Sequence, residues 1–421
     1  MSKRKQNALC KLIKTNKDFR NQLNRLYDKL GEVEDTRSDI NKKYALQDIL
    51  FLLVLGLMFG KNDPTNIQRL LSMARIQRTI EKHLKYKGKI PSKQVFLEAL
   101  HTVPPLSFNA ALNEWVKVFS QGPGAQLAFD GKAVRAALAK IEGKNHSDYI
   151  LNAYIVGTGL FIMQMRVGEK TNEAKTMPKL LSLLELEKSP VTVDAAGTYG
   201  EIADGILSSN GHFLLPLKEN QPNLLNATKK HFEAAKETDI RIFVDDRMGK
   251  KEHGRYERRT YSVISLNALP VLEKYIDNHT SLSKMVGAVC KVVRERYVEK
   301  VGADGKRFLE ESTQTLYYIT SMADITPERF GEYALGHWSV ETAHYVLDTV
   351  FHEDLSTIRK GHGMENMSLL RKLAYNALVL FRALFPKGCA FQHMRDLLLV
   401  NMQDYLFNVF KKGKPAACAP S

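Results

Sequence analysis

The chain has 421 residues, 44% of them hydrophobic, which is enough for about two or three folding units with buried cores. Its formal net charge of +15 indicates a polyanionic partner, with nucleic acid favoured over an acidic membrane surface. The four cysteines are scattered and form no CxxC pair, which argues against a cysteine zinc site and a disulfide scaffold. We therefore expect a protein of a reducing, cytoplasmic compartment, without a signal peptide or a membrane-spanning segment.

Residues 1–120 have the pattern of an all-helical N-terminal domain, which we expect to bind DNA. Apolar residues recur there at helical spacing, and Pro91-Ser92 is typical of a helix start. The expected helices cover Tyr44–Gly60, Asn66–Leu84, Ser92–Leu100 and Leu112–Phe119. The sequence Gln121-Gly122-Pro123-Gly124 breaks this pattern and marks a domain boundary.

The period of the apolar residues then changes, and residues 121–237 predict strands alternating with helices. The expected strands are Gln126–Asp130, a hairpin of Tyr149–Val156 and Leu160–Val167, then Pro190–Val193 and His212–Leu217. Residues 238–320 alternate like β-strands between charged turns and predict a β-rich insertion. Residues 321–385 return to helices and complete the α/β core. Residues 386–421 predict a C-terminal helix and a disordered tail.

Three acidic residues occupy positions where a site could form: Asp130 ends the first expected strand, Asp194 follows the fourth, and Glu341 lies on a helix expected over 335–351. One line of that helix carries His337, Glu341, His344 and Asp348, in steps of four, three and four residues. In a ribonuclease-H-like fold the first and fourth strands are neighbours, so the first two acids would face each other. Converging carboxylates suffice for two Mg²⁺ ions about 3.5–4 Å apart, as phosphodiester cleavage requires. The alternative is strand-end turn chemistry beside a solvated helix face.

Short motifs in this chain resemble, in the same order, those of DDE-type insertion-sequence transposases of the H-repeat-associated group. The first acid lies in Asp130-Gly131-Lys132 and the second in Val191-Thr192-Val193-Asp194-Ala195. The third lies in His337-Trp338-Ser339-Val340-Glu341, followed by Leu347-Asp348, Phe351 and Glu353-Asp354. Three further motifs lie at Val167–Glu173, Leu217–Pro222 and His253–Arg259. The resemblance runs through most of residues 30–385.

This resemblance implies a ribonuclease-H-like mixed sheet flanked by helices, with the β-rich insertion and the helical N-terminal domain already described. It implies a DNA transposase that cuts the ends of its element and joins the 3′-hydroxyl to target DNA. Asp130, Asp194 and Glu341 would be the catalytic residues and the ligands of Mg²⁺, for which Mn²⁺ would substitute. Double-stranded DNA is the expected partner, and a homodimer in a synaptic complex is the expected assembly.

Residues near the three acids are candidates for DNA contacts: Lys132, Lys218, Asn220, His253, Arg255, His337, Arg359 and Lys360. An arginine fork suits a phosphate or a guanine edge, and the pair Arg359-Lys360 follows the helix of the third acid. The structural alternatives are a solvated lysine at 132, a helix entry at 218–221 and a β-turn at 253–259. Related transposases often carry Arg and Lys where this chain has His337 and Asp348.

Two other functions stay open on the sequence alone. A nuclease with the same site would cut DNA but never join strands, and a strand-transfer assay with pre-cut ends separates it from a transposase. A relic of a transposase would bind DNA without cleaving it, and the presence of all three acids weighs against this reading.

Overall fold

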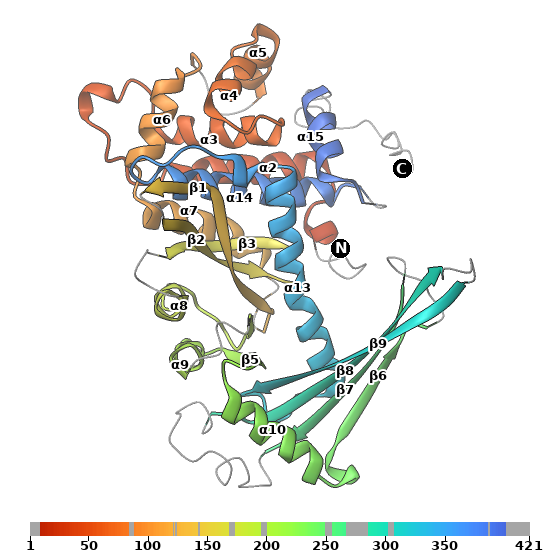
Figure 1. Cartoon of the computed structure of the whole chain (residues 1–421). Coiled ribbons are helices and arrows are strands. Elements are labelled where there is room, and N and C mark those ends of the chain that lie inside the picture. Colours follow the sequence, from red (N-terminus) through yellow and green to blue (C-terminus); the bar gives the residue numbers. More distant parts are fainter. Residues whose placement is uncertain are drawn as a thin grey trace. The chain divides into compact units, whose positions relative to one another are not determined.

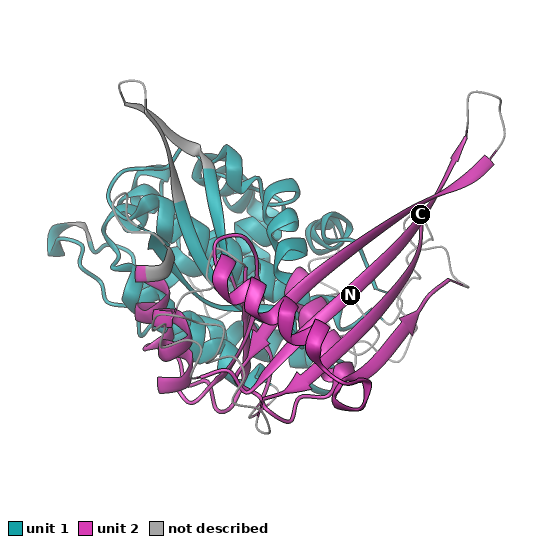
Figure 2. Cartoon of the chain, turned by 60° about the horizontal axis from the view of Figure 1, so that its bottom comes forward, with its two compact units in different colours: residues 1–121, 130–172, 339–421 teal, residues 122–129, 173–338 magenta. Residues whose placement is uncertain are grey.

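The computed structural model describes residues 9–83, 88–120, 122, 124–141, 144–167, 173–194, 200–248, 255–266, 285–301, 307–385 and 388–400. The chain divides into two compact units, which Figure 2 shows in different colours. Unit 1 comprises residues 1–121, 130–172 and 339–421, and unit 2 comprises residues 122–129 and 173–338. Strand β1 (Leu127–Ile141) and helix α13 (Pro327–Thr349) contribute to both units. The expected tail after residue 400 and the motif residue His253 lie outside the described residues.

Helices are the only regular elements of the described residues before 121 (Figure 1). They are α2 (Asn16–Leu30), α3 (Leu46–Met58), α4 (Pro64–Leu71), α5 (Ala74–His83), α6 (Lys93–Thr102) and α7 (Pro105–Val116), with short 3-10 turns η1 (Asp39–Asn41) and η2 (Lys117–Phe119). The predicted helix start at Ser92 is confirmed, since its hydroxyl accepts a hydrogen bond from the Val95 backbone. The single helix predicted over 66–84 is wrong, because the chain leaves the helix at Ser72 and begins α5 at Ala74.

Unit 1 is built around two helices that are buried on nearly every side. Helix α14 (Gly363–Arg382) packs against α3, α6, α7 and strand β3 (Leu160–Val167), and most of its side chains are buried. Helix α3 is buried almost throughout, as expected for a helix without a polar face. Helix α15 (Phe391–Val400) packs on α14. The short turn η5 (Glu353–Leu355) lies between α13 and α14 in the chain.

The strands of unit 1 follow the order β3-β2-β1, with β2 (Lys144–Ile155) antiparallel to β3. The predicted hairpin is confirmed, and its turn residue Gly159 has a positive φ of 80°. The expectation that the first strand ends at Asp130 is wrong, because β1 continues to Ile141. From Gly131 to Val134 the residues alternate between half-buried and buried, and buried Val134 packs with Ile150 and Met364. Core packing therefore outweighs the turn tendency of Asp-Gly.

Unit 2 contains a mixed sheet with the strand order β1-β4-β5-β9-β8-β7-β6. These strands are β4 (Pro190–Val193), β5 (His212–Leu217), β6 (Arg241–Asp246), β7 (Arg255–Ser265), β8 (Ala288–Val301) and β9 (Arg307–Thr320). Its helices are α8 (Glu173–Leu181), α9 (Gly200–Ser208), α10 (Pro222–Ala234) and a short turn η4 (Glu237–Asp239). Strands β1, β4 and β5 are parallel, which confirms that the first and fourth strands are neighbours.

The strands predicted for residues 238–320 extend the sheet of unit 2, because β9 pairs antiparallel with β5. Phe330, in the first turns of α13, packs with Tyr261 and Val263 of β7 in the core of this region. The chain is thus a mixed α/β protein in which a large sheet carries both parallel and antiparallel pairs. Within the described residues, every helix is too short or too polar to cross a lipid bilayer.

A buried ion network in unit 1 joins β1, η5 and α14. The carboxylate of Glu353 is 1% exposed and accepts a hydrogen bond from the Ser368 hydroxyl at 2.7 Å. The ammonium nitrogen of Lys132 lies 3.2 Å from Glu353 Oε2, and that of Lys372 lies 3.9 Å from Oε1. Burial alone would raise the pKa of Glu353, but the charges of Lys372 and Lys132 lower it to about 2.

We expect Glu353→Gln to lower the free energy of unfolding by about 3–5 kcal/mol, because it leaves buried Lys132 and Lys372 without their shared anion. Urea unfolding at pH 7 measures this change, with Glu34→Gln at an exposed site as the matched control. The ionised carboxylate stabilises the fold above its ordinary pKa of 4.5, and this contribution disappears as the pH falls towards about 2. The difference in unfolding free energy between wild type and Glu353→Gln should therefore shrink as the pH falls from 4.5 towards about 2. If Glu353→Gln and Glu34→Gln changed the unfolding free energy equally at pH 7, Glu353 would not be the stabilising anion of this network.

Candidate active site

Two of the three predicted acids come directly after the paired residues of a parallel ladder between adjacent strands. In unit 2, Leu127 pairs with Val191 and Phe129 with Val193, so β1 and β4 run side by side in the same direction. Asp194 is the first residue after β4, and Asp130 is the residue after Phe129 along β1. Ligands of such sheets bind beyond the carboxyl ends of parallel strands.

Asp130 itself belongs to unit 1, where a histidine holds one of its carboxylate oxygens. His344 Nδ1 lies 3.2 Å from Asp130 Oδ2, and Asn152 Nδ2 lies 3.1 Å from His344 Nε2. Because the Asn152 amide donates to Nε2, the proton of the neutral imidazole is on Nδ1, which donates to Asp130. The Phe161 ring stacks on the imidazole, with ring centroids 6.0 Å apart and planes 11° apart.

This arrangement fixes the orientation of the Asp130 carboxylate. Oδ2 is held by His344, while Oδ1 has no hydrogen bond or ion pair with any described residue. His344 is 8% exposed, so solvent barely competes for the contact. The sequence pattern places His344 on the polar line of its helix but indicates no role for it. Its spacing of three residues from Glu341 is the one feature of the sequence that could have indicated a place near the predicted site.

Lys132, predicted to contact DNA, is instead directed to carboxylates of its own unit. Its side chain is 7% exposed, and its ammonium lies 2.7 Å from Asp348 Oδ1 and 3.2 Å from Asp354 Oδ1, in addition to Glu353. Burial would lower the pKa of Lys132, but Glu353 and the hydrogen bond to Asp348 raise it above its ordinary value. This lysine therefore stays charged and ties β1 to the end of α13. Its contact with DNA stays a prediction.

Asp194 lines a cavity of about 650 Å³ in unit 2. Lys218 and Asn220, two of the residues predicted to contact DNA, line the same cavity. The ammonium of Lys218 lies 3.5 Å from Asp194 Oδ1, and both side chains are more than half exposed, at 57% and 56%. The structure thus brings together three of the predicted site residues, with the exposed carboxylate of Asp194 among them.

Helix α13 carries the third acid without a break between Pro327 and Thr349. Its first half is attached to the strands of unit 2, since His337 Nδ1 lies 3.1 Å from Thr192 Oγ1 of β4. Gln126, the residue before β1, also bonds to this helix, because its side-chain Nε2 donates a hydrogen bond to the Tyr333 carbonyl at 2.7 Å. Glu341 is exposed and follows His337 by one helical turn, so both lie on the same side of α13. His337 contacts Thr192 in the structure, and its contact with DNA stays a prediction.

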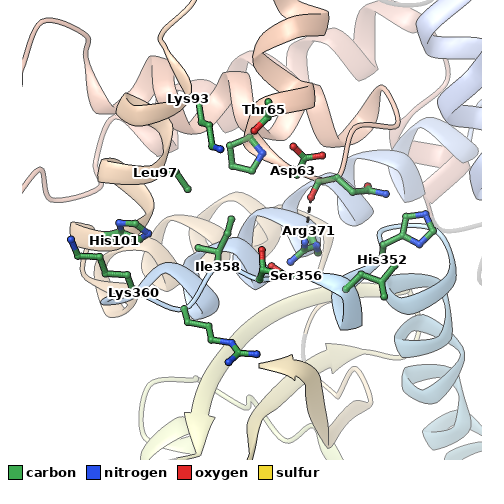
Figure 3. Close-up of a pocket in the computed structure, with 15 residues that line it drawn as sticks. Asp63, Thr65, Lys93, Leu97, His101, His352, Ser356, Ile358, Lys360 and Arg371 are labelled. Carbon is green, nitrogen blue, oxygen red and sulfur yellow. Dashed lines mark hydrogen bonds between the residues drawn. The ribbon is translucent and has the colours of Figure 1, made fainter. Parts of the chain in front are cut away.

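The remaining predicted DNA contacts lie elsewhere in the two units. Arg255 on β7 lies 3.9 Å from Glu257 Oε2, within a group of arginines that surround this carboxylate. Glu257 also pairs with Arg259, Arg294 and Arg296. Arg359 and Lys360 line a second cavity, of about 680 Å³, in unit 1 (Figure 3).

No three His, Cys, Asp or Glu side chains are grouped as a metal site in the part of the chain that the structure describes. Asp130 and Glu341 belong to unit 1 and Asp194 to unit 2. The donor chemistry nevertheless fits Mg²⁺, which prefers hard oxygen ligands and retains several waters. Asp130 has one oxygen unused by described residues, and the carboxylates of Asp194 and Glu341 are exposed.

Comparisons with known proteins agree with these features. The family model described as "Transposase DDE domain" matches residues 122–377, and one described as "DDE_Tnp_1-associated" matches residues 27–116. The chain is 28% identical to "Putative transposase YncI" of Escherichia coli O157:H7, over 84% of this chain and 87% of that protein. It is 27% identical to "H repeat-associated putative transposase YhhI" of Escherichia coli K12, over 85% of this chain and 91% of that protein.

Among solved structures, the chain is similar to a piggyBac transposase synaptic complex with hairpin DNA, determined by cryo-electron microscopy. The TM-score is 0.40 at 12% identity, over 95% of this chain and 80% of that chain. The family model covers more than half of the sequence and includes all three predicted acids. The chain therefore belongs to the family of transposases that carry a DDE domain.

Proposed function

We propose that this transposase cuts the ends of a DNA element and joins the freed 3′-hydroxyl to target DNA. Asp130, Asp194 and Glu341 are the proposed catalytic residues. The observation that carries this proposal is the parallel pairing of Phe129 with Val193, because the next residue along each strand is one of the acids. The third acid lies on a continuous helix whose first half is hydrogen-bonded to the same strand β4.

The same three carboxylates are the proposed ligands of Mg²⁺, with Mn²⁺ as a substitute. Bound metal would supply an activated oxygen nucleophile and would stabilise the charge on the leaving oxygen. The residues of the chain contribute position and charge: His344 orients Asp130, and the Lys218 ammonium, 3.5 Å from Asp194, adds positive charge where phosphate would approach. The net charge of +15 favours association with DNA.

We further propose that the core is ribonuclease-H-like and comprises residues 121–237 and 321–385. The strand orders β3-β2-β1 in unit 1 and β1-β4-β5 in unit 2 support this proposal. Residues 1–120 are the proposed N-terminal DNA-binding domain, residues 238–320 the insertion and residues 386–421 the C-terminal segment. A homodimer that holds two double-stranded DNA ends in the cytoplasm is the proposed working assembly.

The first test is cleavage of DNA that carries the flanking genomic ends, in the presence of Mn²⁺. We expect Asp194→Asn to lower the nicking rate by at least about 10³-fold, because the carboxylate charge that holds the metal is lost. Asp204→Asn, an exposed aspartate on α9 outside the cavity, is the matched control and should keep the wild-type rate. Equal nicking by wild type and Asp194→Asn would exclude the proposed site. Nicking without joining of pre-cut ends would identify a nuclease instead.

The second test concerns His344 as a positioning residue for Asp130. We expect His344→Ala to weaken Mn²⁺ binding by about 10–100-fold, because an outer partner that orients a ligating carboxylate is lost. His344→Gln, whose amide can still donate to Asp130, should recover part of that affinity. Isothermal titration calorimetry with Mn²⁺ and no DNA measures the effect, and Tyr345→Ala, at a site that is 67% exposed, is the control. Unchanged Mn²⁺ affinity in a folded His344→Ala protein would rule out the role.

A further inference from the structure

The second cavity has the size and charge of a site for an anion. It lies within unit 1, has a volume of about 680 Å³ and is lined by Lys93, Arg359, Lys360 and Arg371 (Figure 3). This volume is within the range of about 300–1,000 Å³ that is typical of ligand sites. Asp63 contributes the one carboxylate of the lining, and it is engaged as the N-cap of α4 by the backbone and side-chain amides of Asn66.

The buried guanidinium of Arg371 is the strongest indication of a negatively charged ligand. Its side chain is 2% exposed, and it donates from Nε to the Phe351 carbonyl at 3.2 Å and from Nη2 to the Asn62 carbonyl at 3.4 Å. It forms no direct ion pair with a described carboxylate, and burial lowers its pKa against the opposing charges of Glu353 and Asp348. The direct hydrogen-bond partners of this buried charge are neutral carbonyls, so an anion in the adjoining cavity would add to the compensation that Glu353 and Asp348 give at longer range.

The cavity is held in shape by backbone contacts. His362 donates its backbone N–H to the His101 carbonyl at the end of α6, with a distance of 3.1 Å. Gly361 has a positive φ of 56°, and a side chain there would place a Cβ 2.4 Å from the same carbonyl oxygen. The basic segment that contains Arg359 and Lys360 is thus fixed against α6, which carries Lys93. Cationic groups on rigid elements are suited to phosphate recognition, because little order must be gained on binding.

We propose that this cavity binds a backbone phosphate of DNA, with Lys93 from the N-terminal helices and Lys360 from the segment after α13 among its exposed cations. The phosphodiester as ligand rests on the proposed function, since the cavity alone indicates only an oxyanion. The geometry assigns the N-terminal helices and the catalytic segment to one DNA contact, rather than to separate ones. Neither lysine forms an ion pair with a described carboxylate.

The experiment measures binding of a labelled DNA duplex across a series of salt concentrations, in EDTA so that no cleavage occurs. For Lys93→Gln/Lys360→Gln we expect about tenfold weaker binding at 0.1 M salt. The slope of log affinity against log salt should become less steep by about 0.9 for each phosphate contact that is lost. Lys43→Gln, an exposed lysine of the same unit outside the cavity, should leave the slope unchanged.

Inorganic phosphate, tested as a competitor, separates a DNA site from a site for free phosphate. The proposal is supported if phosphate no longer competes with DNA in the double variant and the slope of log affinity against log salt is also reduced. Competition with an unchanged slope indicates a free-phosphate site and overturns it, as does a double variant that behaves like Lys43→Gln in both measurements. Because no metal is present, a protein that fails to cleave DNA can still pass this test. All the substituted lysines are at exposed positions, and the melting temperatures of the double variant and of Lys43→Gln check that the fold is intact.

Discussion

The short parallel ladder between β1 and β4 is the constraint on which the rest of the candidate site depends. It joins residues 127–129 to residues 191–193, which are separated in sequence by a hairpin and a helix. Parallel strands need such a crossover, and the ladder then ends at the same level on both strands, although β1 itself continues to Ile141. An acid directly after each strand segment needs no special loop conformation to reach that edge, because the backbone direction is already set.

Charges in unit 1 are arranged so that buried cations and anions stabilise one another. Lys132 follows Asp130 by two residues on β1 and pairs with carboxylates at the end of α13 and in η5. Asp130 is oriented separately by His344, from the same helix. Strand and helix are thus connected twice, once by an ion pair and once by a hydrogen bond. The proposed role of Asp130 would benefit from both connections, since small displacements of a metal ligand reduce metal affinity and rate.

Much of the fold could be predicted because local patterns agree with the tertiary structure. The β2–β3 hairpin, β4 and β5 have strand-like apolar runs that are bounded by clear turn residues, and the structure confirms them. The continuation of β1 beyond Asp130 could not be predicted, because Asp-Gly ordinarily favours a turn and the packing of Val134 is a long-range effect. The break between α4 and α5 has no glycine or proline to indicate it.

The proposed acids could be selected from their expected places at strand ends and on a late helix, but their partners could not. Nothing in the sequence indicates that Asn152 and Phe161, on neighbouring strands, enclose the imidazole of His344. Lys132 appears in the sequence as a solvent-exposed lysine, and its burial depends on three carboxylates more than 200 residues away. Contacts of this range depend on the assembled fold rather than on local spacing.

The most direct measurement is anomalous diffraction from crystals of the protein grown with a DNA end and Mn²⁺. We expect anomalous peaks for Mn²⁺ within bonding distance of carboxylate oxygens from Asp130, Asp194 and Glu341. Mn²⁺ bound elsewhere, or carboxylates that remain apart while DNA and metal are both present, would contradict this expectation.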